Sequence, residues 1–214
     1  WSDGADKERF LALPGSAQID FSRDGAWSFP AQSVLVKNFY LERQIVETRF
    51  LVKHPSGPTW DGYSYMWDED GRDATLLEGS ATHTYTINGR EHTYYFPSRS
   101  ECLVCHTPAS GYALGLRTDQ FNGEHNYGEV TDNQLRTLNH IALFSTDIGT
   151  DLDALPRLPN PTDEKALVAA RARAYLDVNC AFCHSPGGSG RADMDLRFNT
   201  PLAQTHLLDV PPRF

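Results

Sequence analysis

All four cysteines of this 214-residue chain belong to two short motifs, in which the second cysteine is followed directly by a histidine. The two motifs consist of Cys102, Cys105 and His106, and of Cys180, Cys183 and His184. Two cysteines separated by two residues and followed by histidine form the attachment motif of c-type haem. The thiols add to the haem vinyl groups, and the histidine ligates the iron. The spacing therefore predicts two covalently bound c-type haems, with His106 and His184 as proximal iron ligands.

The same residue types support two other chemistries. Two cysteine pairs can hold a structural zinc ion, but Cys102 and Cys180 lie 78 positions apart, far beyond the usual ribbon spacing. A thioredoxin-like redox pair does not explain a histidine after both pairs. Covalent haem is attached outside the cytoplasm, so the motifs also predict a periplasmic or extracellular location. Since no cysteine remains for a disulfide, the fold must depend on its core and its haems.

The sixth ligand of each iron decides what that haem can do. A methionine or histidine gives a closed electron-transfer site, whereas an open position allows ligand binding or catalysis. For the first haem we favour His140, because a helix expected there would place it beside Leu138 and Phe144 on an apolar face. His125 and Met66 are the alternatives, the first expected to be solvated and the second to pack within a strand.

The second haem has two candidate distal ligands within this chain. Met194 lies 10 residues after His184, a short reach to the other side of a haem, whereas His206 lies 22 residues after it. A side chain of another subunit, or a methionine beyond Phe214, is the remaining alternative.

The first half of the chain has the composition of β-strands. β-branched and aromatic residues predict strands at 33–41, 44–52, 63–67, 82–87 and 93–96. Asn88-Gly89 suits the type I′ turn of a hairpin between the last two of these. The acidic stretch 68–73 predicts a solvated turn, because it lacks the ligand spacing of a calcium loop.

The second half has two helical patterns separated by a segment rich in proline and aspartate. The first pattern spans 131–144, with Thr131 as expected N-cap, and the second begins at Thr162 and leads into the second motif. Its expected apolar face consists of Leu167, Ala170, Ala174 and Val178. Residues 147–161 have linker composition, so we expect two domains, 1–150 and 151–214. The predicted fold class is α+β, with a β-rich N-terminal haem domain and a small helical cytochrome c-like domain that is incomplete in this sequence.

Charge and hydropathy narrow the range of partners. The net charge of -9 disfavours nucleic acid and suits basic redox proteins. No stretch approaches the roughly 18 apolar residues that a membrane helix needs. The start Trp1-Ser2-Asp3-Gly4 is typical of a mature or trimmed chain.

Two groups of matching strings add resemblances to known cytochromes. In the second half they are 172–180, 184–188 and 194–197. These resemble small helical cytochrome c domains, and in particular a subgroup found in secreted bacterial proteins whose chain continues past the position of Phe214. In the first half they are Phe29-Pro30, 34–37, 47–49, 62–67, 73–76, 97–102, 114–116 and 140–144. These resemble a bacterial family of two-haem c-type cytochromes.

A looser likeness is to β-rich mono-haem cytochromes that oxidise hydroxylamine. Those proteins carry a lysine cross-link to the haem and leave one face of the iron open. In this chain Lys37 and Lys53 are candidates for such a lysine by residue type alone.

Together these features predict a periplasmic or extracellular di-haem c-type cytochrome that acts in one-electron transfer between redox proteins, with no catalytic residue of its own. One alternative is a haem enzyme whose open first haem acts on a small nitrogen or oxygen compound. Another is a subunit of a homo-oligomer or larger assembly that conducts electrons through stacked haems.

Overall fold

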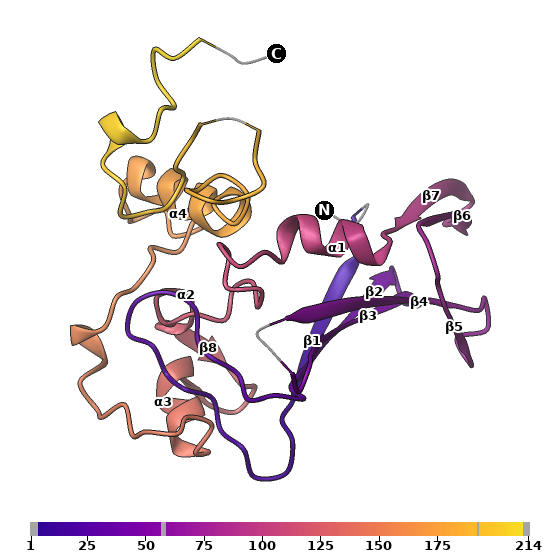
Figure 1. Ribbon diagram of the computed structural model, residues 1–214, viewed down its shortest axis with the longest axis horizontal. Coiled ribbons are helices and arrows are strands. Elements are labelled where there is room, and N and C mark those ends of the chain that lie inside the picture. Colours follow the sequence, from indigo (N-terminus) through magenta and orange to yellow (C-terminus); the bar gives the residue numbers. More distant parts are fainter. Residues whose placement is uncertain (1–3, 57–58, 192, 212–214) are drawn as a thin grey trace. The chain divides into compact units, whose positions relative to one another are not determined.

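The computed structural model describes residues 4–56, 59–191 and 193–211. The chain forms two compact units (Figure 1). Unit 1 comprises 1–17 and 30–103, and unit 2 comprises 18–29 and 104–214. The described residues form a β-rich α+β fold with antiparallel sheets, as expected.

Unit 1 contains a five-stranded antiparallel sheet and a separate hairpin. The sheet has the order β1 (Asp6–Ala12), β2 (Val34–Leu41), β3 (Gln44–Lys53), β4 (Trp60–Trp67) and β5 (Ala74–Leu76). The hairpin consists of β6 (Ala81–Ile87) and β7 (Arg90–Phe96), and helix α1 (Arg99–Cys105) follows it. All five predicted strands are confirmed, whereas β1 and β5 were not expected. Positive φ angles of 52° at Asn88 and 73° at Gly89 confirm the predicted turn.

The 68–73 segment is a turn, as expected, closed by a hydrogen bond from the Asp68 amide to the Asp73 carbonyl. The core of unit 1 draws side chains from the sheet and from the hairpin. It consists of Ala5, Phe39, Leu41, Val46, Tyr85, Tyr94 and Phe96. Met66 packs against this cluster, in agreement with the packing role expected for it.

A fully buried carboxylate lies beside this core. Glu47 accepts two hydrogen bonds of 2.7 Å from the Arg49 guanidinium. The hydroxyls of Ser64 and Tyr94 each donate a further hydrogen bond of 2.8 Å to it. Because every lone pair faces a donor, the charge of Glu47 is accommodated without water.

Unit 2 is built from short elements. They are α2 (Thr118–Phe121), β8 (Glu124–Asn126), β9 (Thr131–Asn133), α3 (Gln134–His140), α4 (Val168–Cys180) and two 3₁₀ turns, Leu152–Ala154 and Leu202–Gln204. The 18–29 segment contributes the buried Trp27, whose ring lies 5.0 Å from the rings of Phe121 and Phe144. The Trp27 indole N–H also donates to the Thr118 hydroxyl at 3.0 Å. An N-terminal segment thus completes the core of the C-terminal unit.

Both predicted helix starts are wrong. Thr131 lies in β9, paired with Asn126, and Asn133 is the N-cap of α3 because its side-chain oxygen accepts from the Leu135 amide. Thr162 lies in a turn, where the Asn160 side chain accepts from both its amide and its hydroxyl. Helix α4 therefore begins only at Val168.

The two units also divide the chain differently from the expected boundary. Residues 147–161 belong to unit 2, where the buried Asn122 side chain donates to the carbonyls of Leu152 and Leu155. No helix among the described residues combines the length and apolar character required to cross a membrane.

Candidate functional site

Helix α1 carries the first cysteine pair and has a defined start. The Ser98 hydroxyl accepts from the Glu101 amide at 3.4 Å, and the Glu101 carboxylate accepts from the Ser98 amide at 2.8 Å. This reciprocal arrangement is a capping box. The Ser-x-x-Glu pattern of Ser98 and Glu101 is a sequence signal for this helix start, although the segment is too short to show helical periodicity.

Cys102 lies directly against strand β4. A Cβ atom built on Gly62 would be 2.7 Å from Cys102 Cβ and 2.8 Å from its Sγ, so glycine is needed for this close approach. Burial raises the pKa of the Cys102 thiol, and the nearby positive charge of Arg49 acts in the opposite direction. The thiol is therefore held at a packed and specific position on the sheet.

His106 is oriented by a backbone carbonyl. Its Nδ1 atom donates a short hydrogen bond to the Tyr112 carbonyl, which fixes the proton on Nδ1 and leaves the lone pair on Nε2. Metal-ligating histidines are typically held by such a bond from the other ring nitrogen. Tyr112 has a φ of 60°, a strained conformation for a residue with a side chain. The chain thus accepts local strain at the residue whose carbonyl orients the His106 imidazole.

The second motif begins at the last residue of α4. The His184 amide donates to the Cys180 carbonyl at 2.8 Å, and the Gly190 amide donates to the Cys183 carbonyl at 2.9 Å. The loop then encloses the imidazole, because a Cβ on Gly190 would lie 2.6 Å from His184 Nδ1. This Nδ1 is buried and has no hydrogen-bond partner in the part of the chain that the structure describes. Nε2 is consequently the nitrogen of His184 best placed to ligate a metal.

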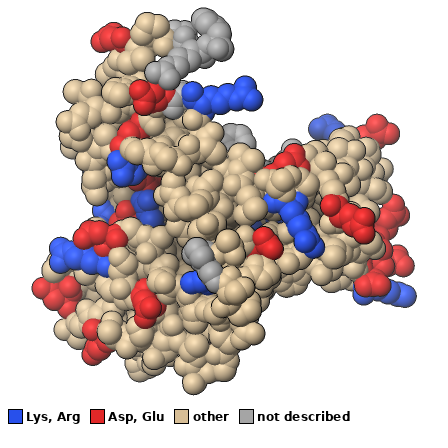
Figure 2. All heavy atoms as spheres, in the orientation of Figure 1, with Lys and Arg blue, Asp and Glu red and all other residues tan. Residues whose placement is uncertain are grey.

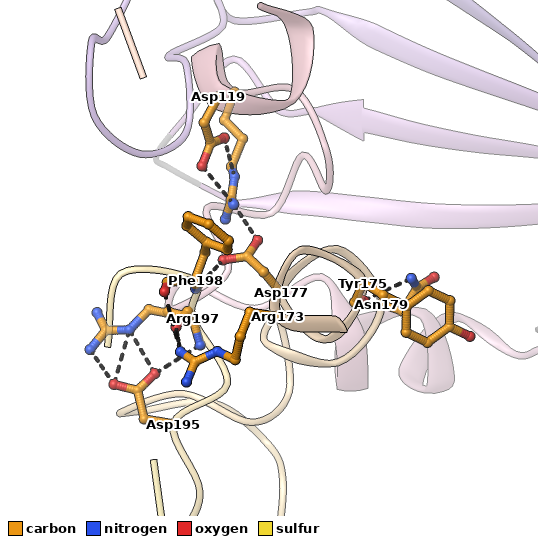
Figure 3. A network of polar contacts seen from close by, with 9 residues as sticks. Asp119, Arg173, Tyr175, Asp177, Asn179, Asp195, Arg197 and Phe198 are labelled. Atoms are coloured by element: carbon orange, nitrogen blue, oxygen red, sulfur yellow. Dashed lines mark hydrogen bonds and ion pairs between the residues drawn. The ribbon is translucent and has the colours of Figure 1, made fainter. Parts of the chain in front are cut away.

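A network of charged groups anchors α4 within unit 2 (Figure 3). The buried Asp177 carboxylate accepts from the Arg117 guanidinium and, at 2.8 Å, from the Phe198 amide. Arg173 donates from one Nη2 atom to three carbonyls, of which Arg197 and Thr200 are the nearest, at 2.6 and 2.7 Å. These contacts fix the helix whose end carries Cys180.

Within unit 2, the loop after the second motif touches the segment of the first. The Ser189 hydroxyl donates to the Val104 carbonyl and lies 3.4 Å from Cys183 Sγ. A Cβ on Gly187 would lie 3.6 Å from the Cβ of Ala109, an ordinary packing distance. Within unit 2, Val104 of the first motif and Cys183 of the second are therefore both in contact with Ser189.

Two of the three distal candidates predicted for the first haem, His140 and His125, are on the surface. His140 ends α3 and is exposed, and Ile141 next to it is 61% exposed, so the expected apolar face does not extend to these residues. The reason is that α3 stops at His140, after which Ala142 adopts a φ of 55° and turns the chain. His125 is exposed as expected, with its ring edge-on to Tyr127.

Of the two candidates predicted for the second haem, His206 is oriented by a backbone carbonyl. Its Nδ1 donates to the Asp193 carbonyl at 2.7 Å, the same type of bond that orients His106. His206 also lines a hollow of about 530 Å³, together with Leu202, Ala203, Leu208, Asp209 and Val210. Met194 is half-buried in the same loop region.

The described residues were also compared with the arrangement that a bound metal ion requires. Among the described residues, which include all four cysteines, no group of three or more His, Cys, Asp or Glu side chains is arranged to hold a metal ion. Each motif instead presents two thiols and one imidazole whose Nδ1 is hydrogen-bonded or enclosed. Comparisons with protein-family models, curated proteins and solved structures found no match to this chain.

Proposed function

We propose that this chain is a periplasmic or extracellular di-haem c-type cytochrome that transfers single electrons between redox proteins. The observation that carries the proposal is the pair of Cys-x-x-Cys-His motifs, each of which presents an imidazole with Nδ1 hydrogen-bonded or enclosed. Bound haem would supply a one-electron couple between ferric and ferrous iron.

The residues of the chain set the conditions for this couple. Cys102 and Cys105 would hold one haem and Cys180 and Cys183 the other, while the histidine after each pair would provide the proximal nitrogen. The Tyr112 carbonyl accepts a hydrogen bond from Nδ1 of His106. This bond makes the other ring nitrogen more basic, and a more basic ligand would favour ferric iron. Contact between Ser189 and the first motif supports a relay in which both haems work as a pair.

The charge of the chain bears on its partners. The net charge is -9, and Figure 2 shows Asp and Glu side chains gathered over the part of unit 1 that carries β5 to β7. Such a surface would attract a basic redox partner at low ionic strength.

Expression with a cytochrome c maturation system should yield two covalent haems per chain. A pyridine haemochrome assay would measure haem against protein, and an intact mass would count the covalently attached groups. A chain that carries a single haem, or that binds zinc through its cysteines, would contradict the proposal. A variant in which both cysteines of one motif are replaced by alanine should carry one haem, and it provides the reference for the haem count.

One observation favours a second function, that of a haem enzyme with an open first haem. His140 and His125 are both exposed, and Met66 packs in the core of unit 1. An iron without a distal ligand could bind a small nitrogen or oxygen compound.

The spin state of the first haem distinguishes the two functions. If His140 ligates the iron, the wild type is low-spin and the His140→Ala variant becomes high-spin and binds carbon monoxide. The helix should persist in this variant, since alanine favours helix more than histidine does. A wild-type first haem that is already high-spin would favour the enzyme. A low-spin haem that His140→Ala leaves unchanged would assign the distal site to another residue.

A further inference from the structure

One face of the five-stranded sheet in unit 1 carries a row of cations. Arg9 of β1 pairs with Lys37 of β2, and Lys37 pairs with Arg49 of β3. Side chains at directly paired positions point to the same side of a sheet. Lys7, two residues before Arg9, shares this face. The ammonium groups of Lys7 and Lys37 lie 5.9 and 6.0 Å from the Phe39 ring centroid, and the Arg49 guanidinium carbon lies 4.3 Å from it.

The negative charge on this face of the sheet is smaller than the positive charge of the row of cations. Glu47 is the carboxylate that reaches it, and its oxygens are already engaged by Arg49, Ser64 and Tyr94. The Lys37 ammonium donates no hydrogen bond to any residue that the structure describes and forms no ion pair with one, although the residue is half-buried. Like charges placed opposite each other across strands are destabilising. The face therefore has surplus positive charge, and the Lys37 ammonium lies near the Phe39 ring without an ion pair.

The protonation of Lys37 reflects this environment. Burial, followed by the charges of Arg9, Arg49 and Lys7, lowers the pKa of Lys37 to about 8. An anion beside the ammonium would oppose both causes, because it would compensate for lost water and for repulsion.

The same face carries the attachment point of the first haem. Arg49 pairs with Ser64 on β4, and Gly62, two residues before Ser64, is the glycine against which Cys102 packs. The Cys102 thiol is close enough to Arg49 for the two charges to interact. A group bonded to the Cys102 sulfur would therefore lie close to the row of cations.

We propose that Lys37, assisted by Lys7 and Arg9, binds a carboxylate or similar oxyanion on this face of the sheet. One source of such a carboxylate is a propionate of the first haem, and this assignment rests on the proposed function. The other source with the same chemistry is a free oxyanion from solution.

Resonance Raman spectra of the two-haem protein test the first source. The bending band of the haem propionates reports their hydrogen bonds, so we expect it to shift in Lys37→Met and in Arg9→Met. Arg43→Met is the matched control, because Arg43 is exposed in the turn between β2 and β3 and its loss changes the net charge equally. Arg9 is exposed on an edge strand, so its variant remains informative if Lys37→Met does not fold.

Calorimetric titration of the same proteins with phosphate and with acetate tests the second source. Binding of a free oxyanion at Lys37 should weaken about tenfold in Lys37→Met and remain unchanged in Arg43→Met. A Raman shift or this loss of affinity supports the site and identifies its source. If the Raman bands are unchanged and no anion binding depends on Lys37, the proposed oxyanion site is wrong. The proposed function still stands in that case, provided that two haems are counted. If the wild type carries fewer than two haems, the proposed function fails and the phosphate titration still tests the site.

Discussion

Replacing both Cys180 and Cys183 with alanine is expected to remove one haem and to unfold most of the chain beyond residue 160. The described residues of this region bury little apolar surface. Its buried side chains are Ala174, Asp177, Ala181, Leu196 and Thr205, whereas Leu167, Val168, Tyr175, Val178, Leu202, Leu208 and Val210 are exposed. A segment with so small a core normally depends on a covalent staple or a cofactor.

Limited proteolysis checks this expectation. Cleavage beyond residue 160 should become at least about tenfold faster, which corresponds to a loss of about 1.4 kcal/mol of local stability. The strand signal of unit 1 in circular dichroism should persist, because its core comes from the sheet and the hairpin. Cys102→Ala with Cys105→Ala is the matched control, expected to lose one haem and to keep the 160–211 region resistant. Equal resistance of both double variants would show that the second haem does not support this region.

Glu47→Gln is expected to destabilise unit 1 by about 3 kcal/mol, the lower end of the range for breaking a buried ion pair. The lower end applies because the Arg49 side chain is 26% exposed and can recruit water. The amide keeps the shape of the carboxylate, but it turns a donor toward Arg49 or toward the hydroxyls of Ser64 and Tyr94. The remaining cations on this face would also lose the carboxylate that partly offsets their repulsion.

Denaturant unfolding followed by circular dichroism measures this loss. Glu91→Gln, on an exposed residue of β7, removes the same charge without touching the core and should change stability by less than about 0.5 kcal/mol. Tyr94→Phe removes a single hydrogen bond to the carboxylate and should cost about 1.5–3 kcal/mol. Similar stability of Glu47→Gln and Glu91→Gln would mean that the buried network contributes nothing to unit 1.

Local patterns in the sequence were sufficient for several features. The two attachment motifs depend on residues within five positions of each other, so no tertiary information was needed to locate them. The strands of 33–52 follow from their β-branched and aromatic residues, and the turn at Asn88-Gly89 follows from the tolerance of these residues for positive φ. The identity of the cofactor and the function remain predictions that haem analysis must test.

Features that depend on distant partners could not be predicted in this way. The strand β1 is rich in charged residues and is stabilised by its pairing with β2, so its composition alone does not indicate a strand. The starts of α3 and α4 were misplaced because Thr131 pairs with β8 and Thr162 bonds to Asn160, which uses both threonines outside the helices.

Only the tertiary structure decided which residues surround the two Cys-x-x-Cys-His motifs. It placed Gly62 against Cys102 and Ser189 against Val104, contacts that join residues 40 and 85 positions apart. It also left His140 at an exposed helix end and aligned Arg9, Lys37 and Arg49 across three strands. Strand register and chain reversal determine such neighbours, and both are set by the packing of the whole unit. The sequence by itself thus determined the positions of the two Cys-x-x-Cys-His motifs, where we propose that haem is attached, whereas the tertiary structure decided which side chains stand beside each motif.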